Sequence, residues 1–200
     1  MIYLQFPSVR PASVDWQFAT VSESFASPFT GDEQTASQPG AARWFSSLSF
    51  ENLTRSEAAE LEAFLVRCNG TAGRFYLWNH AREIPLGSCD GTPLVDGAAN
   101  YGGLLATRGW TPNATGVLRV GDYIGFNNEL KMVLDTVNAD ASGLANIVIG
   151  PNIRNVPADG AEISLIKPKG IFRLLDDQQA KMAYRKQTGS YQFTCVETWS

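Results

Sequence analysis

Apolar residues alternate with polar or small ones over residues 14–18, 44–50 and 191–199. A period of two residues is typical of a strand that buries one face, because successive side chains point to opposite sides of a sheet. We therefore predict strands near both ends of the chain. A further short strand is predicted from Arg74 to Trp78.

One amphipathic helix is predicted over residues 55–68. Thr54 and Glu57 form a capping box, in which each side chain satisfies a free backbone amide group at the helix start. Asn69-Gly70 supplies residues that tolerate the left-handed conformation of a helix end. Between these signals the apolar residues recur at helical spacing and form one stripe: Leu61, Phe64, Leu65 and Cys68.

The composition changes near residue 83. Residues 85–116 are rich in Gly, Pro, Ala and Thr, and a series of short apolar segments separated by turn residues follows. Such a series favours a small barrel or curled sheet. The expected strands of this series are 122–126, 130–137, 145–150, 162–166 and 171–175.

Nothing in this series requires the last strand of the chain as a partner. We therefore expect residues 191–199 to return to the N-terminal sheet. The predicted fold class is mainly β, a β-sandwich with one amphipathic helix plus an inserted small β-barrel-like domain. Residues 1–82 and 177–200 would form the sandwich, and residues 83–176 would form the insertion.

A polar segment from Ser24 to Ala42 is too hydrophilic to be core. It is rich in Ser, Pro, Gly, Gln and Thr, and it has turn residues around one aromatic side chain, Phe29. We expect a loop or hairpin arm with Phe29 exposed.

Composition and charge exclude several classes of function. The 200 residues contain 16 Lys and Arg against 20 Asp and Glu, a net charge of −4, which argues against a nucleic-acid partner. No apolar run reaches the length of about 18 residues that a membrane helix needs, and no leader segment is expected. The charged fraction is 18%, below the typical value of about 25%. This indicates either protein contacts or an uncharged polar β surface.

The candidates for chemistry are few and scattered. Three cysteines, Cys68, Cys89 and Cys195, lack the paired spacing of a zinc site and suit a reducing cytosol. His80 is the single histidine and has no nucleophile motif beside it, and Asp176-Asp177 is typical of a solvated turn. We predict no enzyme activity, no cofactor and no metal.

The five tryptophans could form a sugar-stacking platform, protein–protein anchors, or part of the core. Trp110 and Phe29 lie among Gly and Pro residues and are expected to be exposed. The candidate interface residues are Phe29, Trp44 and Trp110.

Several short motifs are spread over most of the chain. They are Ser27-Pro28-Phe29-Thr30-Gly31-Asp32-Glu33-Gln34, Arg43-Trp44, Cys68-Asn69-Gly70, residues 91–98, 109–112, 117–123, 139–143, 150–154 and 170–174. Each motif is weak alone, but in their order and spacing they together resemble tail-tip proteins of long-tailed bacteriophages, and specifically the distal tail protein family.

This resemblance implies a virion structural protein, made in the host bacterial cytoplasm and located at the tail tip. It implies a ring, commonly of six copies, that joins the tail tube to the hub and receptor-binding parts. The partners would be further copies of the chain, tail tube and hub proteins, and a host surface glycan if the insertion binds one. Members of the family often carry a carbohydrate-binding-like module at the C-terminus, whereas here the second module is inserted. The alternative function is a carbohydrate-binding β-sandwich module with Trp110 in its site.

Overall fold

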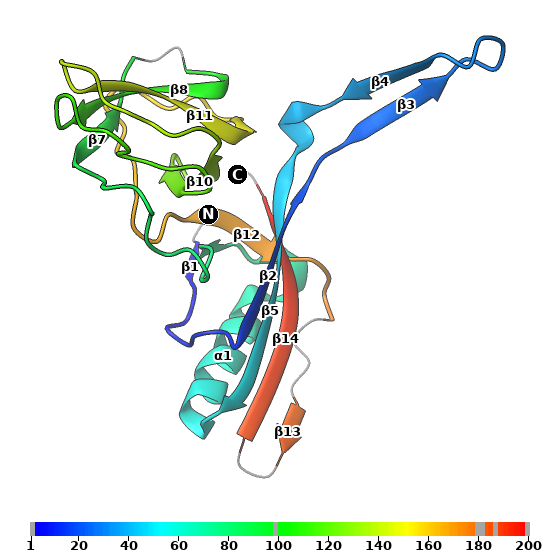
Figure 1. The fold of residues 1–200 in the computed structure, drawn as a ribbon. Coiled ribbons are helices and arrows are strands. Elements are labelled where there is room, and N and C mark those ends of the chain that lie inside the picture. Colours follow the sequence, from blue (N-terminus) through cyan, green and yellow to red (C-terminus); the bar gives the residue numbers. More distant parts are fainter. Residues whose placement is uncertain (1–2, 98–99, 179–182, 186–187, 199–200) are drawn as a thin grey trace.

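A computed structural model describes residues 3–97, 100–178, 183–185 and 188–198, and it contains two main β-sheets, a projecting hairpin and one α-helix (Figure 1). The larger sheet has seven strands. Six follow the order β1-β6-β12-β14-β5-β2, and β13 pairs with the first residues of β14. The β1–β6 pair is parallel and the other pairs are antiparallel. The strands are β1 (Leu4–Gln5), β2 (Ser13–Ala19), β5 (Arg43–Leu53), β6 (Phe75–Leu77), β12 (Gly170–Leu174), β13 (Ala183–Arg185) and β14 (Thr188–Glu197).

The helix α1 (Arg55–Cys68) begins and ends where the sequence predicts. Glu57 Oε2 accepts a hydrogen bond from the Thr54 backbone N at 2.9 Å, and Thr54 Oγ1 accepts one from the Glu57 backbone N at 3.4 Å. Asn69 ends the helix in the left-handed conformation, with φ of 48°. The apolar stripe of α1 is buried in one cluster with residues of β5 and β14, among them Leu48, Phe50 and Phe193.

The smaller sheet has five antiparallel strands in the order β7-β8-β11-β10-β9 and curls into a half-barrel. Its edge strands both contact the same segment, through bridges from Leu94 to Glu162 and from Gly125 to Ser164. It has its own apolar core, which contains Leu105, Trp110 and Ile147. The strands are β7 (Gly91–Val95), β8 (Gly102–Trp110), β9 (Tyr123–Phe126), β10 (Glu129–Val133) and β11 (Leu144–Ile153).

The mainly β fold class, with one amphipathic helix and a second barrel-like unit, is confirmed. The last strand also pairs as expected, because β14 lies between β5 and β12.

One predicted strand belongs to a different sheet. Residues 171–175 were expected to complete the barrel series, but β12 pairs with β6 and β14 of the larger sheet. Phe172 lies opposite Phe75 on one side and Glu197 on the other. Most of β12 is buried, which suits an interior strand, and its apolar run does not reveal which sheet it joins.

Part of the Gly- and Pro-rich segment 85–116 is also strand, namely β7 and β8. Its glycines allow the backbones of these two strands to lie close together. Gly109 has φ of +90°, and a Cβ atom there would lie 2.4 Å from the Thr92 backbone oxygen. The glycine therefore permits a tight strand contact, and it does not mark a loop.

The polar segment forms a two-stranded hairpin, β3 (Ser22–Ala26) and β4 (Glu33–Ser37), followed by a short 3₁₀ turn, η1 (Pro39–Ala41). It extends β2 and β5 beyond the sheet and projects away from both sheets (Figure 1). We call residues 22–37 the arm. A second 3₁₀ turn, η2 (Gly70–Ala72), follows α1.

Candidate functional site: the arm and the groove at its base

The arm has no core of its own. Every residue of β3 and β4 is exposed, and Phe29 at the tip is 95% exposed. The strands are joined by the backbone ladder and by a cross-strand hydrogen bond of 3.0 Å between the hydroxyls of Ser24 and Thr35. An isolated two-stranded hairpin is marginally stable in water. A projecting hairpin with an exposed aromatic tip is therefore a surface suited to contact with another molecule.

The turn that carries Phe29 is held by its own hydrogen bonds. Ser27 Oγ accepts from the backbone N of Phe29 at 3.4 Å and of Thr30 at 3.3 Å. The Ser27 backbone N donates to the Asp32 oxygen at 2.8 Å, and Gly31 N donates to the Ser27 oxygen at 3.0 Å. Gly31 has φ of +74°, which glycine adopts without strain. The tip is thus preorganised around an exposed phenyl ring.

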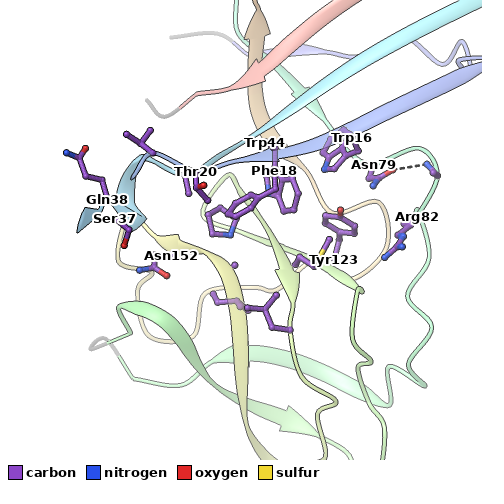
Figure 2. A pocket seen from close by; sticks show the side chains of 18 of the residues that line it. Trp16, Phe18, Thr20, Ser37, Gln38, Trp44, Asn79, Arg82, Tyr123 and Asn152 are labelled. Carbon is purple, nitrogen blue, oxygen red and sulfur yellow. Dashed lines mark hydrogen bonds between the residues drawn. The ribbon is translucent and has the colours of Figure 1, made fainter. Parts of the chain in front are cut away.

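A groove of about 720 Å³ lies at the base of the arm, between the β2–β5 hairpin and strands β10 and β11 of the smaller sheet (Figure 2). We call this space the groove. It is lined mainly by aromatic and aliphatic side chains, with polar groups at its two ends (Figure 2). The lining includes Trp16, Phe18, Trp44, Tyr123, Met132, Leu134 and Ile149, with Asn79 and Arg82 at one end and Gln38 and Asn152 at the other.

The aromatic rings of the groove pack against each other. Trp44 is buried, and its Nε1 donates to the Leu130 backbone oxygen at 3.0 Å. Its ring centroid lies 5.1 Å from that of Phe18 and 5.6 Å from that of Tyr123. Phe18 is 43% exposed. Trp44 therefore forms part of a fixed floor, and Phe18 offers accessible apolar surface above it.

A buried ionic cluster next to the groove residue Asn152 joins the two sheets. Lys131 Nζ lies 2.5 Å from Glu129 Oε2 and donates to the Asn152 backbone oxygen at 2.8 Å. Arg154 Nη2 lies 2.5 Å from Glu197 Oε2, so the end of β11 is tied to β14. Burial lowers the pKa of Lys131 and raises that of Glu197. The cluster fixes the smaller sheet against the larger one, and with it the shape of the groove.

The structure separates the three candidate interface residues. Phe29 lies at the arm tip and Trp44 lies in the groove floor, whereas Trp110 lies in the core of the smaller sheet. The expectation that Trp110 is exposed is wrong, because it is 3% exposed and its Nε1 donates to Thr107 Oγ1 at 2.8 Å. A sugar-stacking platform needs an accessible ring, so Trp110 cannot serve as one in this fold.

The scattered candidates for chemistry occupy structural positions. His80 is 5% exposed, and its ring centroid lies 5.3 Å from that of Phe6 and 4.6 Å from that of Trp78. Burial lowers its pKa to about 4. Asp177 Oδ1 accepts from the Thr71 backbone N at 2.8 Å, and Asp176 Oδ1 accepts from the Gln178 backbone N at 2.8 Å.

The cysteines are free thiols, and Cys68 and Cys195 are buried. Burial raises the pKa of both, to about 12 for Cys68, so neither offers a reactive thiolate at neutral pH. Within the described ranges, no group of three or more His, Cys, Asp and Glu side chains is placed to hold a metal ion.

The groove itself was not predicted from the sequence. Arg82, Asn79 and Tyr123 line it, and none of them belongs to a motif that points to binding. The alternation around Trp16 and Phe18 indicates a buried strand face, which describes only one wall. The other walls come from segments distant in sequence, which a local pattern cannot bring together.

Neither a protein-family model nor a curated protein sequence matches this chain. In the part of the chain that the structure describes, no helix is long and apolar enough to cross a membrane. The case for a function therefore rests on the arm, the groove and the motif resemblance.

Proposed function

We propose that this protein is a structural component of a bacteriophage tail tip, where copies form a ring that connects the tail tube to the hub and the receptor-binding parts. The motif resemblance supplies this identity, a ring of about six copies, and a location in the virion. The role is one of assembly, without a catalytic step, a cofactor or a metal ion.

The observation that carries the proposal is the arm. It exposes an aromatic tip, in which Ser27 holds the backbone of the turn while the Phe29 side chain is 95% exposed. A closed ring repeats one heterologous contact, in which one surface of a copy meets a different surface of the next copy. A projecting hairpin suits such a contact because it reaches beyond the body of its own subunit (Figure 1).

The smaller sheet is the unit that would face other tail proteins or a host glycan. Its partly exposed apolar side chains include Leu104, Leu144 and Val148, which lie on β8 and β11. The glycan alternative depended on an exposed Trp110, and this side chain is buried. We therefore assign this sheet a role in contact with neighbouring tail proteins.

The test is the assembly state of the purified protein, measured by native mass spectrometry and by negative-stain electron microscopy across a range of concentrations. We expect closed rings with a central channel. The matched control lacks the arm, with residues 21–41 replaced by Asn-Gly, a sequence that closes two-residue hairpins. Ala19 and Arg43 are paired in the sheet, so β2 and β5 remain joined in this variant.

We expect the control to unfold as cooperatively as the parent and to remain monomeric. A parent that is monomeric at every concentration would overturn the proposal. Rings of unchanged size from the armless variant would also contradict it, because the observation that carries the proposal would then be irrelevant to assembly.

A further inference from the structure

We infer that the arm tip of one copy docks in the groove of a second copy, with the Phe29 ring against the aromatic floor. The inference rests on the proposed function for the closure of the ring. The contact itself follows from two parts of this chain that lie at the two ends of its arm. We call the arm tip with Phe29 the plug and the groove the socket.

The tip has the properties of a plug. Phe29 lies at the apex of a turn whose backbone is held by Ser27 and Gly31, so little backbone conformational entropy remains to be lost when it binds. Aromatic side chains that enter a pocket commonly carry most of the energy of a protein contact.

The groove has the properties of a matching socket. Its volume of about 720 Å³ is in the range of roughly 300–1,000 Å³ that accommodates compact ligands, so a phenyl ring and the adjoining turn can enter. Apolar side chains dominate its lining, and Phe18 and Leu134 present exposed surface there. Covering these side chains together with Phe29 removes three exposed apolar groups from water in one contact.

Charge favours the same pairing. The arm carries Glu23, Asp32 and Glu33, and no Lys or Arg occurs from residue 11 to residue 42. Arg82 is the charged residue among the described side chains that line the groove. Its Nη1 donates to the Gly121 backbone oxygen at 2.9 Å, which holds the guanidinium at one end of the groove. An acidic plug therefore meets a socket with a cationic end.

The occupant is a second copy because a chain cannot fill its own groove. The arm projects away from the sheets (Figure 1), and Val21 and Gln38, which lie at its base, line the groove. Strand β3 (Ser22–Ala26) alone separates the tip from the base by roughly 13 Å at about 3.3 Å per residue. A plug and a socket separated in this way on one chain make a heterologous contact, which each added copy repeats.

The test is site-directed cross-linking between two singly labelled chains, both in a Cys89→Ala background, since Cys68 and Cys195 are buried. One chain carries Thr30→Cys beside the plug, which keeps Phe29 intact. The other carries Thr20→Cys at the groove. The matched control replaces the second chain with one that carries Tyr101→Cys, a residue that is 74% exposed and outside the groove lining.

With a short bis-maleimide, we expect the Thr30→Cys and Thr20→Cys mixture to cross-link at least several-fold more than the control mixture. Adding Phe29→Ser should abolish this preference and weaken self-association roughly 10- to 100-fold, as expected when one phenyl ring loses its burial. Tyr101→Ser should leave the cross-linking preference and the strength of self-association unchanged.

Equal cross-linking in the two mixtures overturns the inference, as does preferential cross-linking between two Thr30→Cys chains, which would indicate a tip-to-tip contact. Closed rings without the groove preference would leave the proposed function standing and remove only this contact. Groove cross-links in open oligomers would retain the contact and overturn the closed ring.

Discussion

Acidification below pH 6.5 should destabilise this protein through His80. The ring is 5% exposed and packs against Phe6 and Trp78, and this burial lowers its pKa to about 4 although Glu83 favours the charged form. An unfolded histidine titrates near 6.5. Above pH 6.5 both states are neutral and the full stability is present. Below it the unfolded state binds a proton that the folded state does not, so stability falls as pH falls towards 4.

The difference between the two pKa values corresponds to about 3 kcal/mol of unfolding free energy. Urea unfolding at pH values from 7.5 to 4.5 measures most of this loss. His80→Phe keeps an aromatic ring in the site and should flatten the slope in this window. Because the chain has one histidine, an NMR titration follows the group without overlap. A folded-state midpoint at 6.5 or higher, or an equal pH slope in the variant, would show that burial of His80 does not control this pH dependence.

Three further changes test the packing. Lys131→Met removes the ammonium partner of the buried Glu129 carboxylate, which keeps hydrogen bonds from the backbone N of Arg154 and Asn155. It should lower the free energy of unfolding by about 3 kcal/mol in urea, with substantial recovery in the Lys131→Met/Glu129→Gln double variant. Thr54→Ala removes the helix cap and should cost about 1 kcal/mol in thermal unfolding, and an unchanged midpoint would contradict the capping role. Gly143→Ala should lower the free energy of unfolding in urea by about 1–3 kcal/mol more than Gly97→Ala does. Both glycines have a similar positive φ, but of the two only Gly143 has a backbone oxygen 2.4 Å from the added Cβ, so equal losses would argue against this clash.

The helix could be predicted to the residue because its signals are local. Thr54 and Glu57 are three residues apart, and Asn69 ends the helix through its own backbone conformation. The hairpin arm could be anticipated for the same reason, since a run of polar residues cannot form a core and Ser27 to Gly31 contains its own turn. In both elements, the residues that predict the structure lie within the few residues that form it.

The sheet assignments depend on distant partners. The apolar pattern of residues 171–175 predicts a strand, yet the choice between two sheets depends on Phe75 and Glu197, which lie far away in the sequence. Trp110 was placed outside the core because glycines surround it, but Gly109 allows close strand packing instead of a loop. The groove combines both difficulties, since residues from β2, β10 and the segment after β6 form its walls.

The position of β14 has a consequence for synthesis of the chain. This strand lies in the interior of the larger sheet, between β5 and β12, but it is translated after both. Residues 54–187 must be synthesised before β5 can acquire this neighbour, which takes roughly 7 to 27 seconds at about 5–20 residues per second. During that time the arm hairpin and the smaller sheet can form from contiguous sequence. Leu48 and Phe50 of β5 meanwhile lack the residues of β14 that neighbour them in the folded protein. The nascent chain therefore passes through a stage in which its outlying parts are complete and its central sheet is open, and this is the stage at which a chaperone would protect it.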